Sequence, residues 1–98
     1  MGAAPLAPAQ VAAAQPERIG AVTHFWPHAN ACAVLIEHGV LRVGDTVHVR
    51  GHTTDFYQRV ERIELEHAPV QTARAGDHVG IEVHQRVREG DVVYRLQK

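Results

Sequence analysis

The sequence predicts an all-β domain, a small barrel or sandwich rich in turns, and three observations support this prediction. Three segments repeat Gly-Asp followed by alternating residues with Val leading, and they begin at Gly44, Gly76 and Gly90. Glycine accepts positive φ at a corner and aspartate can hydrogen-bond the turn, so each segment indicates a strand that leaves a turn. The aliphatic residues are weighted toward Val and Ile, which suit a pleated surface. No convincing amphipathic helix accompanies them.

Length and composition favour one soluble domain. The 98 residues fit a single folded unit, and the Ala- and Pro-rich residues 1–16 are expected to form a disordered tail before a domain at 17–98. The formal net charge of -1 gives no general attraction to phosphate, and no DNA partner is expected. No apolar run is long enough to span a membrane, no signal peptide is evident, and Cys32 is the only cysteine. We therefore expect a cytoplasmic protein without an intrachain disulfide.

The first half of the domain is predicted to contain four extended segments. In the first, Ile19, Ala21, Thr23 and Phe25 share one face, and the segment 26–28 ends it because Pro27 cannot donate to a ladder. The apolar run 31–36 is short and contains β-branched residues, so it is predicted as a strand. A brief segment at 41–43 follows. In the strand 46–50, Val47 and Val49 are predicted to point inward.

The second half begins with a long predicted strand at about 56–67. Phe56 and Val60 share a face, as do Ile63 and Leu65, but the parity changes between the two pairs. A β-bulge near 61–62 would restore one inner face, and two strands with a break are the alternative.

The rest of the chain adds two more strands. These are predicted at 79–83 and at 92–96, where Val92, Tyr94 and Leu96 close the fold. In the connections, Val70 and Ala73 are expected to tuck inward and Val87 to act as an anchor. The pattern as a whole predicts about six strands.

Catalytic patterns are weak in this chain. It has no Ser, its only Lys is Lys98, and Cys32 lies in an apolar run where a thiol is usually inert. The acidic residues at 61, 64 and 66 are typical of an exposed strand. Two His pairs have helical ligand spacing, but Pro27 and Gly51 interrupt them. We expect no enzyme, no cofactor and no metal site, with a histidine-dependent metalloenzyme as the weakest hypothesis.

The loop around residues 50–59 is the best candidate for contact with a partner. Arginine can grip phosphate, threonine can bond sugar or phosphate oxygens, and tyrosine or histidine can stack on a base. An ordinary solvated loop is the alternative, and Arg86 and Arg88 belong to a second polar turn. The candidate residues are Arg50, His52, Thr53, Thr54, Tyr57 and Arg59, with Trp26 from the first strand.

The order of these motifs resembles domain 2 of elongation factor Tu and related translational GTPases. The runs 19–22, 39–47 and 73–81, with Gly51 between them, carry the resemblance over about residues 19–96. It implies a six-stranded closed β-barrel of the kind that holds the aminoacyl end of transfer RNA or touches ribosomal RNA. The chain is similar to small stand-alone elongation-factor-like proteins and to the barrel appended to some collagenase-type peptidases, where recognition rather than catalysis is implied. The insert at 23–28 departs from the pattern, so no ligand contact of the family is transferred.

Two functions are therefore predicted for this chain. The first is a non-catalytic barrel that contacts transfer RNA, ribosomal RNA or a translation-related protein through the region Arg50–Arg59. The alternative is an adaptor that docks on a separately encoded enzyme or GTPase, with Phe25 and Trp26 as anchors. A Trp26 that simply plugs one end of the barrel is the competing structural interpretation. Nothing in the pattern demands a dimer.

Overall fold

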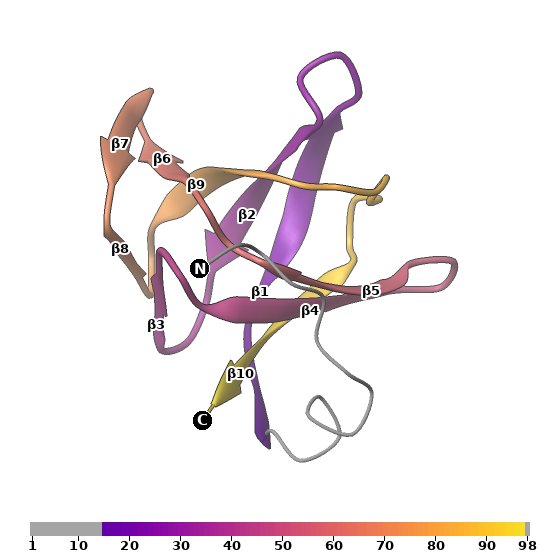
Figure 1. Cartoon of the computed structure of the whole chain (residues 1–98), viewed down its shortest axis with the longest axis horizontal. Helices are drawn as coiled ribbons and strands as arrows, with labels where there is room; N and C mark the ends of the chain where they lie inside the picture. Colours follow the sequence, from indigo (N-terminus) through magenta and orange to yellow (C-terminus); the bar gives the residue numbers. More distant parts are fainter. Residues whose placement is uncertain (1–14, 98) are drawn as a thin grey trace.

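Ten β-strands make up the part of the chain that the structure, a computed structural model, describes, namely residues 15–97 (Figure 1). Eight strands form one antiparallel sheet in the order β5-β4-β10-β1-β2-β9-β6-β7, and β3 pairs separately with β8. The prediction of an all-β domain is confirmed. The strands are β1 (Gln15–Trp26), β2 (Ala31–Ile36), β3 (Val40–Arg42), β4 (Thr46–Arg50), β5 (Asp55–Arg59), β6 (Ile63–Leu65), β7 (Ala68–Val70), β8 (Thr72–Arg74), β9 (His78–Glu82) and β10 (Val92–Gln97).

The strand number and the closure of the sheet differ from the prediction. There are ten strands rather than about six. The brief segment predicted at 41–43 forms as β3, the long strand predicted at 56–67 divides into β5 and β6, and the short strands β7 and β8 form where the sequence indicated only a connection. The large sheet curves round the core, but its hydrogen-bonded order ends at β5 and β7. Those end strands do not pair with each other, so the sheet is a rolled open sheet and the predicted closed barrel is not formed.

The three predicted Gly-Asp corners are confirmed. Each structural unit begins two residues before the glycine, at an arginine. Gly44, Gly76 and Gly90 have φ of 99°, 98° and 92°. In every corner a carboxylate oxygen of the Asp accepts a hydrogen bond from the backbone N–H of an Arg three residues earlier, at 2.8 to 2.9 Å. The Asp N–H in turn donates to the carbonyl oxygen of that Arg. The repeated unit is therefore Arg-x-Gly-Asp, at 42–45, 74–77 and 88–91.

Two irregularities in β1 change which of its side chains face inward. The register shifts between Arg18 and Gly20 against β10, and between Val22 and His24 against β2. Ile19 and Val22 are consequently both buried, whereas strict alternation from Ile19 would place Val22 outside. A Cβ at Gly20 would lie 2.1 Å from the carbonyl oxygen of Leu35, so β1 approaches β2 there too closely for any side chain.

The bulge predicted near residues 61–62 is not formed. β5 ends at Arg59 and β6 begins at Ile63, so the chain breaks into two strands, the alternative interpretation of the parity change.

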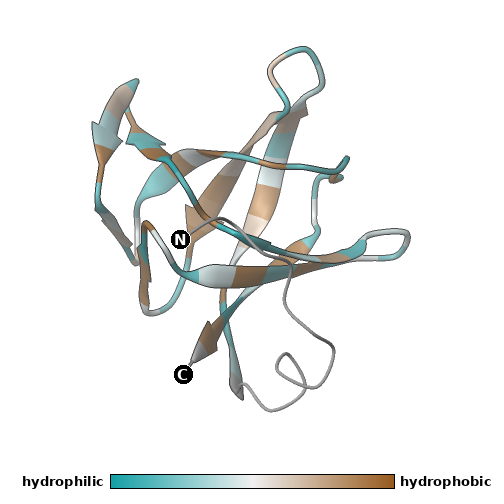
Figure 2. Ribbon diagram, in the orientation of Figure 1, coloured by the Kyte–Doolittle hydropathy of each residue, from teal (hydrophilic) through white to brown (hydrophobic). Residues whose placement is uncertain are grey.

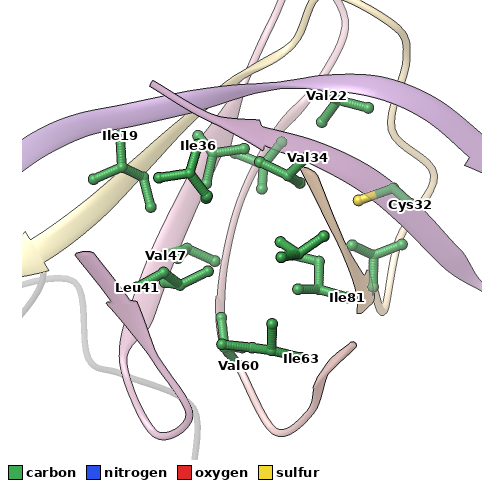
Figure 3. Packing of buried hydrophobic residues seen from close by; sticks show 14 of the residues in the cluster. Ile19, Val22, Cys32, Val34, Ile36, Leu41, Val47, Val60, Ile63 and Ile81 are labelled. Carbon is green, nitrogen blue, oxygen red and sulfur yellow. The ribbon is translucent and has the colours of Figure 1, made fainter. Parts of the chain in front are cut away.

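One hydrophobic core fills the inside of the curved sheet. Figure 3 shows residues from opposite sides of the roll, such as Val34, Val47 and Ile63, directed at one another. Figure 2 shows hydrophobic and hydrophilic residues interspersed along the strands, as expected for a sheet with one buried face. The inward positions predicted for Val47, Val49, Ala73 and Val87 are confirmed.

β5 is an end strand of the sheet, and the side chain of Gln58 links it to the backbone at the end of β9. Gln58 is 8% exposed; its Nε2 donates to the carbonyl oxygen of Glu82 at 2.8 Å. Its Oε1 accepts from the N–H of His84 at 2.9 Å. The amide of Gln58 therefore makes the donor and acceptor contacts that a paired strand would otherwise supply.

The predicted tail lies largely outside the described residues, which begin at Gln15, the first residue of β1. Within 15–97, no helix of the length and apolarity required for a bilayer crossing is present.

Candidate functional site

The predicted contact loop is the tip of the β4–β5 hairpin. Arg50 pairs with Asp55 across the hairpin, and the N–H of Gly51 donates to the carbonyl oxygen of Thr54 at 2.7 Å. The side chains of Arg50, His52 and Thr53 are exposed, whereas Thr54 is only 5% exposed. In this conformation the first three are available to a partner and Thr54 belongs to the interior of the turn.

A second polar loop lies against this hairpin tip, on the same side of the molecule (Figure 1). The Nε of Arg88 donates to Oγ1 of Thr53 at 2.9 Å. A Cβ at Gly51 would lie 1.9 Å from Oδ1 of Asp91, so the two segments meet in close contact. The sequence indicated both polar segments but not that they meet. We call the surface that they form together the loop end; it comprises Arg50, His52, Thr53, Arg86 and Arg88.

Trp26 neighbours the loop end through His24. The rings of His24 and Trp26 lie 4.7 Å apart at an angle of 56°, and Nδ1 of His24 is 3.7 Å from Oε2 of Glu89 in the second loop. Phe25, the other predicted anchor, is half-buried and packs against the core. Of the two predicted aromatic anchors, Trp26 alone is therefore exposed.

Trp26 also borders an open groove on the outside of the sheet, of about 420 Å³. Ala31 and Gly80, which have little or no side chain, leave space for this groove. Arg62 and Glu64 also line it and form an ion pair at 2.8 Å. With 45% of its surface exposed, Trp26 lies at the rim of this groove rather than in the interior of the fold. The lining residues are Trp26, Ala29, Ala31, Arg62, Glu64, His67, Gly80, Ile81 and Glu82. We call this surface the Trp26 groove.

Tyr57 belongs to a third surface, on the outer face of β5, β4 and β10. Its ring stacks on that of His48 at 4.0 Å and 16°, and the ring of Tyr94 lies 6.0 Å from His48 on the next strand. Nε2 of His48 is 2.6 Å from Oδ1 of Asp55. Sequence reasoning selected Tyr57 but missed His48 and Tyr94, because only the cross-strand register aligns the three residues. We call these three residues the aromatic row.

The only cysteine, Cys32, is buried in the core. No group of three or more His, Cys, Asp or Glu between residues 15 and 97 could hold a metal ion. Burial raises the pKa of the Cys32 thiol from 9.0 to about 12, with a smaller contribution from the charge of Asp91. A thiol in that state is a poor nucleophile at neutral pH, because the thiolate is the reactive form.

Comparison with known families agrees with the resemblance seen in the sequence. The family model for elongation factor Tu domain 2 matches residues 32–94. An uncharacterized protease of Methanocaldococcus jannaschii is 33% identical over 81 residues, which are 82% of this chain and 20% of that protein. A collagenase of Porphyromonas gingivalis is 32% identical over 81 residues, 82% of this chain and 22% of that protein. Elongation factor 1-alpha of Thermococcus celer is 38% identical over 65 residues, 58% of this chain and 15% of the factor. The chain thus spans about a fifth of the length of the curated relatives that it matches first.

Solved structures show the same fold. The C-terminal domain of a Geobacillus thermoleovorans protein assigned to the U32 peptidases superimposes with a TM-score of 0.75 at 24% identity, covering 84% of this chain and 93% of that domain. Its selenomethionine variant gives a TM-score of 0.74, covering 79% and 96%.

Proposed function

The chain belongs to the elongation factor Tu domain 2 family, and from this premise we propose that it is a non-catalytic recognition module that contacts RNA through the loop end. The observation that carries the proposal is the meeting of the two Arg-bearing loops, which the Arg88–Thr53 hydrogen bond joins across 35 residues of sequence. That the protein is a stand-alone elongation-factor-like protein is part of this proposal.

The side chains of the loop end suit phosphate contacts. Arg50 and Arg86 are exposed, and among residues 15–97 neither has an ion-pair partner within 4.0 Å. Arg88 uses its Nε for Thr53, which orients the guanidinium and leaves its terminal N–H groups for a ligand. His52 adds an exposed ring beside them. Arginine and hydroxyl groups are the side chains that most often bond phosphate and sugar oxygens.

The overall charge limits how strong this contact can be. With a formal net charge of -1, affinity depends on local arginines rather than on the field of the whole domain. We therefore expect modest binding that weakens as salt displaces the phosphate contacts.

The test is binding of labelled transfer RNA and ribosomal RNA fragments at low and at moderate salt. Arg88→Gln is expected to weaken binding about 5- to 20-fold, since a hydrogen bond to a charged group contributes about 1.5–3 kcal/mol when desolvated and less when exposed. Arg74→Gln is the matched control, because Arg74 occupies the same Arg-x-Gly-Asp position in the turn before β9. Absence of a complex at both salt concentrations would remove the RNA proposal.

A second candidate function, protein docking, is favoured by the exposure of Trp26. Large aromatic side chains concentrate binding energy in interfaces, and this one lies at the rim of the Trp26 groove. The relatives named as a protease and as collagenases carry the matching segment as about a fifth of a longer chain, which supports a module that accompanies another unit.

The docking proposal is tested by co-purification. Trp26→Ala should release a protein partner that the wild type retains, while Arg88→Gln should retain it. If Trp26→Ala keeps the same partner as the wild type, the groove has no docking role. RNA release by Arg88→Gln with no effect of Trp26→Ala would favour the first function over the second.

A further inference from the structure

The aromatic row runs across three neighbouring strands on the outer face of the sheet. Tyr57 on β5 is the register partner of His48 on β4, and His48 is the register partner of Tyr94 on β10. The ring of His48 is nearly parallel to that of Tyr57, at 4.0 Å and 16°, and tilted by 36° to that of Tyr94. The rings therefore form a short stack that ends at Tyr57, on the last strand of the sheet.

The row is held in place before any ligand arrives. The side chain of His48 is 13% exposed, and its Nε2 lies 2.6 Å from Oδ1 of Asp55. Tyr57 rests on this fixed ring with one face, and among the described residues no aromatic ring covers its other face. With 42% of its surface exposed, Tyr57 is accessible to a ligand from solvent. Such preorganisation reduces the entropy lost on binding.

Arginines flank the row on the same face of the sheet. Arg50 is two residues from His48 on β4, and Arg59 is two residues from Tyr57 on β5, in the opposite direction along the face. Residues two apart on a strand are about 7 Å from each other, within the reach of an arginine side chain. Both guanidinium groups are exposed, and neither makes an ion pair with a residue between 15 and 97 within 4.0 Å.

We propose that the aromatic row is a stacking platform for an unpaired base of single-stranded RNA, with the base on Tyr57 and the phosphates on either side of it near Arg50 and Arg59. The inference rests on the proposed RNA function and adds that the strand is unpaired at this face. A base in a duplex is stacked on both sides and cannot reach a ring on a sheet, whereas an unpaired base can. Cross-strand ring pairs also stabilise sheets, so binding and stability have to be measured separately.

The experiment measures the affinity of labelled oligoadenylate of about ten nucleotides, a length within the usual range of single-stranded sites. Fluorescence anisotropy at low salt compares the wild type with Tyr57→Ala and Tyr57→Phe. Removing one base-stacking ring is worth about 1–3 kcal/mol, so Tyr57→Ala should weaken binding by about 5- to 150-fold. Tyr57→Phe keeps the ring and should bind within about twofold of the wild type.

Two further variants separate stacking from other effects. His48→Ala removes the ring beneath Tyr57 and should weaken binding by less than Tyr57→Ala, because His48 positions Tyr57. Leu35→Ala is the control, because it removes an exposed apolar side chain outside the row, and it should bind as the wild type does. The fluorescence of Trp26, the only tryptophan, reports whether each Tyr57 and His48 variant is folded.

The outcomes separate this inference from the proposed function. If Tyr57→Ala binds as the wild type while Arg88→Gln binds more weakly, RNA contact stays with the loop end and the row has no binding role. Equal affinity for oligoadenylate and for its duplex with oligouridylate would also overturn the inference. No binding by the wild type would overturn both proposals. If Tyr57→Ala fails to fold, proton NMR of the wild type replaces that variant. Stacking of a base on Tyr57 should move its ring-proton resonances upfield when RNA is added. Unchanged resonances would show that the aromatic row does not bind RNA.

Discussion

At the scale of single residues, glycine is required at the three corners because of the backbone conformation, not because a side chain would lack space. Gly76 is the clearest case, since its φ is 98° and a Cβ there would meet nothing within 4 Å. Gly76→Ala should therefore lower the free energy of unfolding by about 1–3 kcal/mol, the cost of a residue held in a sparsely populated backbone region. Urea denaturation measures the loss.

Gly80→Ala is the matched control for that prediction. Gly80 is not among the positive-φ glycines, and a Cβ there would meet only the carbonyl oxygen of Cys32 at 3.9 Å, an ordinary contact. Alanine at a compatible position restricts the unfolded chain, so this variant should be neutral or more stable by up to about 1 kcal/mol. Equal losses at Gly76 and Gly80 would contradict the explanation by backbone conformation.

The raised pKa of the buried Cys32 thiol leads us to expect a loss of stability at high pH. Its pKa rises on folding from 9.0 to about 12, through burial and then the charge of Asp91, so the folded state keeps the proton that the unfolded chain loses. Its contribution to stability is complete below pH 9 and is lost progressively as the pH rises toward 12.

Urea midpoints between pH 8 and pH 11 test this expectation. A pKa shift of one unit corresponds to about 1.4 kcal/mol in the free energy of unfolding. Cys32→Ala is the comparison, because it removes the thiol and leaves every other titrating group in place. The midpoint of the wild type should fall more steeply above pH 9 than that of the variant. Parallel curves would show that Cys32 does not titrate as inferred.

Residue-level prediction from the sequence succeeded where only local conformation mattered. The positive φ of Gly44 and the inward positions of Val47 and Val49 follow from turn chemistry and alternation. Alternation along the first strand separates Val22 from Ile19, yet both are buried, because the register of β1 shifts between Arg18 and Gly20 and again between Val22 and His24. These shifts depend on how β1 pairs with β10 and β2, which the residues of β1 alone do not encode.

At the scale of elements, Gln58 joins β5 to the last residue of β9 and to the segment that follows it. Replacing it with Leu keeps the volume but leaves the carbonyl oxygen of Glu82 and the N–H of His84 without their partner. Gln58→Leu should lower the free energy of unfolding by about 1–3 kcal/mol, because it removes two part-buried hydrogen bonds that each contribute about 0.5–1.5 kcal/mol.

Hydrogen exchange locates that effect. The amide of His84 should exchange faster in Gln58→Leu than in the wild type, while amides in β2 keep their protection. Gln85→Leu is the control, because Gln85 is exposed on the same segment. A change in stability without faster exchange at His84 would place the defect elsewhere.

Elements were predicted unevenly, and their length explains the difference. The run Ala31–Ile36 was predicted with its observed bounds because six apolar residues give a clear signal. Strands of three residues, such as β7 and β8, lie where the sequence indicated a connection, because three residues give no clear alternation and form a strand only through pairing. The aromatic row was missed for the same reason, since His48 and Tyr94 meet only through the register of β4 with β10.

At the scale of the whole molecule, the last strand in the chain lies in the middle of the sheet. β10 pairs with β1 on one side and with β4 on the other. Without it, the β4–β5 hairpin loses its neighbour and Val93, which is fully buried, leaves the core. A chain that ends at Asp91 should not fold, as judged by loss of β-sheet circular dichroism and of a cooperative thermal transition.

Deletion of residues 1–14 is the control for that truncation. The deletion removes none of the ten strands, since β1 begins at Gln15. This variant should retain a cooperative transition. A truncated chain that still unfolds cooperatively without β10 would contradict the central place of that strand.

The overall fold was predictable through family resemblance more than through element counting. The corner motifs between Ile19 and Ile81 led to the elongation factor Tu domain 2 family, which the family match over residues 32–94 bears out. The break at residues 60–62 and the open order of the sheet depend on how β5, β6 and β9 meet, which no single segment encodes. Likewise, the loop end could be listed residue by residue, but the meeting of Thr53 and Arg88 required the folded chain.

The pairing of Gln15 with Gln97 determines how this unit would respond to mechanical tension. β1 and β10 are antiparallel neighbours, so a force that draws these two residues apart acts across the ladder and loads its hydrogen bonds one after another. Hydrogen bonds loaded one at a time break at low force, whereas strands sheared lengthwise resist until many bonds break together. Tension that separates Gln15 from Gln97 would therefore unfold the domain from this pair inward.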